Sequence, residues 1–272
     1  MEISLGKQIE YYRKKAGMTK AAVAKRLGVS PATVTFWEKD AYSPTLFNLR
    51  SLAEVLGCEE SELLSRYSFE LPDKLFEEGH MAWKLRELIE KNGFENSKKA
   101  LDYARMMHDG QFRKGPGQVP YIYHPMNMAC QAFALGIADD TLIPAVLLHD
   151  VVEDTEAKLT DLDERHGGNE EIREIVRLVT KEKGYRQKDY FERISHNRYA
   201  SMVKILDRCS NLSDMTTAFS KEKMAEYVNE TEEYIVPLLL VTKYVNADRW
   251  YDATYLLNYQ IRSMLTAVKA LL

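Results

Sequence analysis

Four polar side chains that could bind a metal ion lie close together near the middle of the chain. The segment Thr141–Asp154 begins with an apolar half, TLIPAVLL, and then contains His149, Asp150, Glu153 and Asp154. On a helix, which turns about 100° per residue, these four side chains fall within an arc of roughly 140°. Carboxylates and an imidazole on one side of a buried helix need compensation, because isolated buried charge costs several kcal/mol or more. A divalent cation is the simplest single compensator.

Two further residues are candidates to complete such a site. His124 lies before Pro125, where a helix over Met126–Leu135 is expected; alone, it would more often be a cap or a surface residue. Asp207 lies inside the apolar helix expected at Met202–Asn211, where it could instead form a salt bridge with its neighbour. With both included, the candidate ligands form a mixed nitrogen and oxygen set, His124, His149, Asp150 and Asp207.

The elements that must position these side chains are predicted to be helices. The chain has 272 residues, which is enough for one large or two modest domains, and 45% of them are hydrophobic. Helical periodicity, few alternating stretches, and only 13 glycines and 8 prolines predict an all-α fold. The net charge of −4 argues against a chain that binds polyanions with its whole surface, but a local basic patch remains open.

The cysteines and the apolar runs indicate a cytoplasmic protein. Cys58, Cys130 and Cys209 have no CxxC spacing, and their odd number and wide separation predict free thiols in a reducing compartment. The first residues, MEISLGKQIEYYRKK, lack the apolar core of a signal peptide. Apolar runs such as Ile235–Val241 are too short to cross a bilayer, so no membrane partner is expected.

Residues 1–66 are predicted to form about five short helices. Gly17 and Gly28 end the first two of them, and Thr19 and Ser30 are good N-caps for the second and third. Pro31 stands at the first helical position, where its missing N–H costs nothing. The clearest expected helices are Leu5–Ala16, Lys20–Leu27, Pro31–Lys39 and Leu46–Leu56.

A capped helix after a tight glycine turn is the helix-turn-helix plan. With Leu27-Gly28-Val29-Ser30 and Ser43-Pro44, the segment resembles the XRE/Cro-like repressor family. The resemblance implies DNA as a partner and a role in transcription regulation. Residues 1–66 contain ten Lys or Arg and eight Asp or Glu, which gives a net charge of only about +2. A domain kept for dimerisation or protein contact therefore remains the alternative. The residues that the resemblance places near DNA are Thr19, Lys20, Pro31, Ala32, Thr33, Phe36 and Lys39.

These patterns divide the chain into three parts. Residues 1–66 are the helix-turn-helix domain. Residues 67–94 are an acidic linker with Pro72, followed by an amphipathic connector helix near Met81–Lys91. Residues 95–272 form the larger all-α domain. Its last two helices are expected near Lys223–Val245 and Asp248–Leu272, and the final one closes the core or forms a dimer contact, so a homodimer is a candidate assembly.

The order of motifs in the larger domain points to one enzyme family. QFRK, PYIYHP, TLIPAVLLHDVVEDT, VRLVTK and VKILDRCSNL follow one another over roughly residues 95–230. They resemble the HD-domain hydrolases of the RelA/SpoT type, which act on alarmones of the stringent response. The resemblance implies an HD phosphohydrolase domain with one bound Mn²⁺. Other divalent metals are alternatives to Mn²⁺. The implied reaction is removal of the 3′-diphosphate from guanosine tetra- or pentaphosphate.

The resemblance also implies a role for each matching residue. His124, His149, Asp150 and Asp207 match the metal ligands, and Glu153 and Asp154 match the pair that positions and deprotonates the attacking water. Arg113 and Lys114 match residues near the phosphates. Further substrate contacts are implied at Asn211, Lys223, Tyr227 and Glu230.

The motifs depart from the family on what is expected to be the nucleotide side. The family has His where Ser210 stands and Arg near Ser213, and the loop between Lys114 and Tyr121 is longer than usual. Two other functions therefore stay open. One is a repressor that senses a nucleotide through a non-catalytic HD site. The other is an HD phosphohydrolase for another phosphorylated nucleotide, such as a 2′- or 3′-phosphorylated one.

Overall fold

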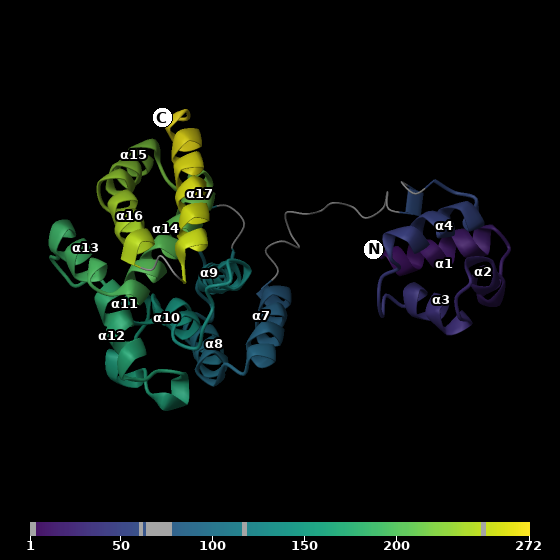
Figure 1. The fold of residues 1–272 in the computed structure, drawn as a ribbon, viewed down its shortest axis with the longest axis horizontal. Coiled ribbons are helices and arrows are strands. Elements are labelled where there is room, and N and C mark those ends of the chain that lie inside the picture. The colour runs from purple at the N-terminus through teal and green to yellow at the C-terminus, as the bar shows by residue number, and fades with distance from the viewer. Residues whose placement is uncertain (1–3, 60–61, 64–77, 116–118, 246–248) are drawn as a thin grey trace. The chain divides into compact units, whose positions relative to one another are not determined.

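The chain folds into two compact helical units. The computed structural model describes residues 4–59, 62–63, 78–115, 119–245 and 249–272. Unit one is Met1–Leu75 and unit two is Phe76–Leu272 (Figure 1). Across these ranges there is no strand, only one isolated bridge between Phe112 and Pro120, which confirms the predicted all-α class. No helix among the described residues is long and apolar enough to cross a membrane.

The first unit is held together by a small apolar core beneath capped helices. Ile9, Val34, Trp37 and Leu52 are fully or almost fully buried. Ser4, Thr19, Ser30 and Thr45 each accept a hydrogen bond from a backbone N–H at the start of a helix, as N-caps do. About five helices were predicted over residues 1–66; the structure describes four of them in full, and residues 62–63 are also helical. The helices are α1 (Leu5–Lys15), α2 (Lys20–Leu27), α3 (Pro31–Glu38) and α4 (Leu46–Leu56).

A buried ion pair connects the helices of this unit. Arg13 of α1 binds the carboxylate of Glu38 at the end of α3. Lys20 of α2 reaches the same carboxylate, with Nζ 3.0 Å from Oε2. Because the Glu38 side chain is buried, loss of both cations would leave its charge uncompensated, which is a strongly destabilising change.

The first half of the second unit packs around one fully buried helix. All seven residues of α10 are buried, and it packs against α8, α9, α12 and α14. This agrees with the apolar half of Thr141–Asp154. The connector region holds α7, which contacts α8 and α9. The helices are α7 (Glu78–Asn92), α8 (Glu95–Met107), α9 (Tyr123–Ala134), α10 (Leu142–Leu148) and α11 (Val151–Asp154).

The continuous helix expected over Thr141–Asp154 is interrupted. α10 ends at Leu148 and α11 begins at Val151, with His149 and Asp150 between them. Nδ1 of His149 lies 2.8 Å from the carbonyl oxygen of Val146. In an unbroken helix that carbonyl would accept from the N–H of residue 150, so the imidazole takes the place of one helical hydrogen bond. The break turns the two polar residues toward neighbouring helices.

The second half of this unit is arranged around α14 (Figure 1). α14 contacts α9, α10, α12, α13, α16 and α17, and 14 of its residues are buried. The expected helix near Lys223–Val245 is divided by the π-helical segment Thr231–Ile235. The elements are η1 (Leu159–Asp161), η2 (Glu164–His166), α12 (Glu170–Val179), α13 (Gln187–Ser195), α14 (Arg198–Ala218), α15 (Lys221–Glu230), η3 (Thr231–Ile235), α16 (Val236–Val245) and α17 (Tyr251–Lys269).

Gly167 allows η2 to pack closely against α8, and replacing it tests this packing. Its φ is +79°, and an added Cβ would lie 2.2 Å from the carbonyl oxygen of Asn96 and 2.6 Å from the N of Ala100. Gly136 has a similar φ of +70° but open space around it. We expect Gly136→Ala to lower the free energy of unfolding by about 1–2 kcal/mol, from backbone strain. Gly167→Ala should cause the same strain and a further loss of about 1–3 kcal/mol in the free energy of unfolding, because the new Cβ clashes with α8.

Urea denaturation of the full chain measures both variants. Equal losses of stability in the two variants would contradict the close packing of η2 on α8.

Candidate active site

Two buried histidines meet where α9 begins and α10 ends. His124 and His149 are 2% and 4% exposed, and their ring centroids are 5.3 Å apart. Each ring has its Nδ1 engaged: His149 with the carbonyl of Val146, and His124 with Oγ of Ser210 at 3.0 Å. Nε2 of His149 is buried, and no hydrogen bond to it is found among the described residues. Both Nε2 atoms are therefore placed to act as ligand atoms.

Two carboxylates complete the cluster. Oδ2 of Asp150 lies 3.0 Å from Nε2 of His149 and 3.8 Å from Nε2 of His124. Oδ1 of Asp207, from the middle of α14, lies 3.2 Å from Nε2 of His124. Ligand atoms of His124, His149 and Asp150 all lie within 4.8 Å of one another. The four predicted ligands thus lie together: His124 is near the start of α9, His149 and Asp150 lie between α10 and α11, and Asp207 of α14 contacts His124.

The electrostatics of the cluster favour a cation. Burial opposes ionisation of Asp207, but the Lys204 ammonium, 2.6 Å from Oδ2, outweighs it and holds the pKa of that carboxyl well below its usual range. Burial also opposes charge on His149, yet the neighbouring Asp150 carboxylate raises the pKa of that imidazole to about 9. Burial lowers the pKa of His124, which leaves it a neutral nitrogen donor. Once His149 gives up its proton, the two nitrogen and two oxygen donors fit a divalent transition metal.

Sequence reasoning assigned no role to Tyr121, yet this residue links the cluster to Asp154. Its hydroxyl lies 2.7 Å from Oδ2 of Asp150 and 2.6 Å from Oδ2 of Asp154. A phenol has one proton, so it donates to one carboxylate at a time. Burial and the two carboxylates raise the pKa of Tyr121, which keeps it protonated. The available signal was its place three residues before His124 in PYIYHP.

The two predicted acid groups of α11 lie in different surroundings. Oε2 of Glu153 accepts a hydrogen bond from the backbone N–H of Lys181 at 2.9 Å, and partial burial of the carboxyl raises its pKa. Asp154 faces Tyr121, and its backbone carbonyl accepts from Nε2 of Gln111 at 3.0 Å. Glu153 is therefore fixed toward α12, while Asp154 faces a cavity.

That cavity has a volume of about 530 Å³ and holds most of the predicted substrate residues. Arg113, Lys114 and Lys223 provide its cations, and Asp154 and Asp214 its anions. Apart from Ala218, the remaining lining residues are polar or aromatic and include Gln111, Tyr121, Asn211, Phe219 and Tyr227. The cavity therefore has the mixture expected for a phosphorylated ligand with a flat ring.

Three residues that were expected on the substrate side have other contacts. Glu230 does not line the cavity; it binds Arg208 and accepts from Nε2 of Gln187 at 2.7 Å. Ser210, expected on the nucleotide side, contacts the ligand His124 instead. The hydroxyl of Ser213 donates to the carbonyl of Ser210 in its own helix at 2.6 Å. The departure at Ser210 thus lies beside a predicted metal ligand and not on the nucleotide side.

The residues predicted to contact DNA lie at the start of α2 and along α3. Pro31, Ala32, Phe36 and Lys39 are exposed. Phe36 packs on Tyr42, which the sequence did not single out, with ring centroids 5.6 Å apart. Three of the predicted residues already have partners within the unit: Thr19 caps α2, Thr33 contacts Ser30, and Lys20 binds Glu38.

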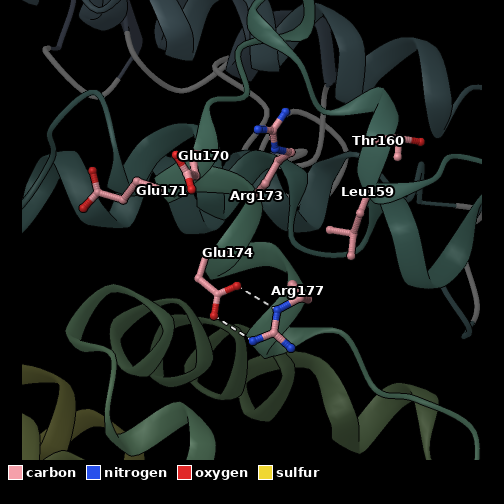
Figure 2. A pocket seen from close by; sticks show the side chains of 7 residues that line it. All are labelled: Leu159, Thr160, Glu170, Glu171, Arg173, Glu174 and Arg177. Atoms are coloured by element: carbon pink, nitrogen blue, oxygen red, sulfur yellow. Dashed lines mark hydrogen bonds and ion pairs between the residues drawn. The ribbon is translucent and has the colours of Figure 1, made fainter.

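A larger hollow lies away from this chemistry. It has a volume of about 870 Å³ and is lined by Leu159, Thr160 and the outward face of α12 (Figure 2). Figure 2 shows Glu174 and Arg177 paired with each other, through two hydrogen bonds of 2.7 Å. Its lining contains none of the cluster residues. We place the active site at the 530 Å³ cavity, because two of its lining residues bind carboxylates of the cluster: Tyr121 binds Asp150, and Asn211 binds Asp207.

An all-α unit that gathers His, His-Asp and Asp beside a cationic cavity defines a metal-dependent phosphohydrolase. A family model for the HD domain matches residues 100–238, and one for the helix-turn-helix matches residues 9–63. The chain belongs to the HD-domain family of enzymes.

Several relatives are named for one hydrolase activity, whereas relatives from Mycobacterium leprae and Myxococcus xanthus are named GTP pyrophosphokinases. The chain is 34% identical to guanosine-3′,5′-bis(diphosphate) 3′-pyrophosphohydrolase MESH1 of Mus musculus over 138 residues, 47% of this chain and 76% of that protein. It is 33% identical to the guanosine-3′,5′-bis(diphosphate) 3′-pyrophosphohydrolase of Aquifex aeolicus over 152 residues, 53% of this chain and 21% of that protein.

A solved structure agrees with these relatives. It was described as a metazoan ortholog of SpoT that hydrolyses ppGpp, and it matches with a TM-score of 0.52 and 25% identity. The match covers 63% of this chain and 94% of that one.

Tyr121→Phe tests whether the bridge between Asp150 and Asp154 contributes to catalysis. The change removes one hydroxyl and keeps the ring. We expect kcat to fall by about 10- to 100-fold, as for other groups that orient a metal site, with metal content retained. Tyr103→Phe is the control, because Tyr103 packs on His166 outside the cavity. Unchanged kcat in Tyr121→Phe would contradict a role for the bridge.

Proposed function

We propose that this chain hydrolyses the 3′-diphosphate of guanosine tetra- or pentaphosphate, with Mn²⁺ as its metal, as part of the stringent response. Support comes from the names of its relatives and from the geometry of the site. The observation that carries the proposal is the Tyr121 bridge. It joins a ligand carboxylate to an acid group at the mouth of a cavity with three cations.

The donor set would hold the metal through His124, His149, Asp150 and Asp207. When bound, a divalent ion supplies Lewis-acid polarisation of a phosphoryl oxygen and acidifies water. The chain itself supplies the proton acceptors. Glu153 and Asp154 are adjacent in the chain and can receive the proton of the attacking water. The backbone N–H of Lys181 holds Glu153, and the hydroxyl of Tyr121 holds Asp154.

The cavity cations would bind the phosphates. Arg113, Lys114 and Lys223 line the cavity, and Asn211 connects Arg113 to Asp207 of the cluster. A guanidinium can hold two phosphate oxygens in parallel, and an ammonium acts as a point charge. Tyr227 and Phe219 offer aromatic surface for a base. We keep Glu230 as an indirect contributor through Arg208, which packs over the Tyr227 ring at 3.7 Å.

Glu153→Gln tests the proposed reaction directly. The full chain with Mn²⁺ should release pyrophosphate from guanosine tetraphosphate, and the variant should lose about 100-fold or more of kcat, because an amide cannot accept the proton. Glu156→Gln is the matched control. It makes the same change two residues after Asp154, at an exposed position outside the cavity.

Two results would contradict parts of the proposal. Turnover of a 2′- or 3′-phosphorylated nucleotide, but not of the tetraphosphate, would favour the alternative phosphohydrolase. Binding of the tetraphosphate without turnover of any nucleotide would favour the repressor that senses it.

We also propose that the N-terminal unit binds DNA. Its family match and the exposed start of α3, with Pro31 and Ala32, support this. Ala32→Glu would place a negative charge on that surface. In a gel-shift assay, the full chain should bind duplex DNA at low salt and bind it more weakly as the salt concentration rises. The variant should not bind. Ala270→Glu, an exposed change of the same charge in the other unit, should leave it intact. No shift at low salt with wild type would favour a protein-contact role.

A homodimer would suit this second role. Helix-turn-helix proteins that read two half-sites bind as dimers. Exposed apolar side chains lie on α16 and α17, namely Leu240, Val241, Tyr255, Leu256 and Tyr259. Light scattering should give twice the chain mass of 31.4 kDa for the wild type. Tyr255→Glu should reduce that mass to one chain; a single-chain mass for the wild type would contradict the dimer.

A further inference from the structure

The guanidinium of Arg113 already has an acidic partner inside the cavity. Its Nε lies 3.0 Å from Oδ2 of Asp214, and its Nη2 lies 3.1 Å from Oδ1 of the same carboxylate. This is the paired geometry that an arginine also uses to hold a phosphate. The edge of Arg113 that would best bind a diphosphate is thus occupied by Asp214.

Arg113 does not depend on Asp214 for its position. Its Nη2 also donates to Oδ1 of Asn211 at 3.0 Å, and its backbone N–H donates to the carbonyl of Val119 at 2.9 Å. Asn211 in turn donates through Nδ2 to Asp207, one of the proposed metal ligands. The arginine is therefore tied to the metal cluster by a contact that does not include Asp214.

Asp214 is able to leave the pair. Its side chain is 42% exposed, whereas that of Arg113 is 16% exposed. An exposed carboxylate can turn toward water at small cost, because surface ion pairs contribute only about 0–1 kcal/mol. If it stayed, its charge would repel a phosphate on Arg113. An incoming diphosphate must therefore exchange places with Asp214.

We propose that Asp214 is a specificity-determining residue that competes with a diphosphate group of the nucleotide for Arg113. The inference rests on the proposed function, since it assumes a diphosphate ligand in this cavity. Asp214 lowers the affinity for each diphosphate that reaches Arg113, and re-formation of the pair favours release of the product. The cavity thereby binds its ligand less tightly than its three cations alone would allow.

Asp214→Asn tests this competition, because asparagine keeps the shape and one acceptor oxygen but removes the charge. Two probes represent the two diphosphates of the nucleotide: guanosine 5′-diphosphate and inorganic pyrophosphate. Calorimetric titration of the metal-loaded full chain should show about five- to tenfold tighter binding of the probe that docks on Arg113. The probe whose affinity changes identifies the diphosphate concerned.

Two further variants separate competition from other effects. Glu222→Gln makes the same charge change at an exposed residue of α15, next to the cavity residue Lys223, and should leave both affinities unchanged. In an Arg113→Gln background, Asp214→Asn should no longer tighten binding, because the group competed for is absent.

Unchanged or weaker binding of both probes in Asp214→Asn would overturn the inference and make Asp214 a support for Arg113. Binding is measured without turnover. A wild-type chain that binds the probes but hydrolyses no alarmone would therefore contradict the proposed function, while the competition is still decided by the affinities.

Discussion

The second unit depends on placing two carboxylates beside two imidazoles in its interior. Asp207 and Asp150 would be costly there without compensation, and the chain supplies only part of it. Lys204 binds one oxygen of Asp207, and Tyr121 contacts Asp150. Nε2 of His149 lies 3.0 Å from the Asp150 carboxylate. A divalent cation bound by these donors would complete the compensation, so a cluster that is costly in a structural core would here form the site.

Hydrogen bonds extend from this cluster in two directions. One path runs from Asp150 through Tyr121 to Asp154, and it reaches the group proposed to handle the proton. The other runs from Asp207 through Asn211 and Arg113 to Asp214, and it reaches the group proposed to hold the phosphate. Chemistry and substrate binding are thus oriented by the same buried donors.

Much of this arrangement could be predicted from sequence, but not all. The apolar run before His149 predicted a buried helix, and α10 is fully buried. The order of motifs along the chain, not the local pattern at each residue, grouped His124 and Asp207 with His149 and Asp150, and Asp207 does contact His124. The break after Leu148 could not be predicted, since it depends on a side chain that takes a backbone acceptor. The same holds for Tyr121, Ser210 and Asp214, whose partners lie 29, 86 and 101 residues away. Contacts at such separations leave no periodicity in the chain.

The proposed reaction requires one divalent cation at the cluster of His124, His149, Asp150 and Asp207. A crystal of the full chain grown with Mn²⁺ and measured at the manganese absorption edge would locate it directly. We expect a single strong anomalous peak in this unit, coordinated by Nε2 of His124 and His149 and by carboxylate oxygens of Asp150 and Asp207. A peak bound instead by Glu153 and Asp154, or no peak beside the histidines, would contradict this expectation.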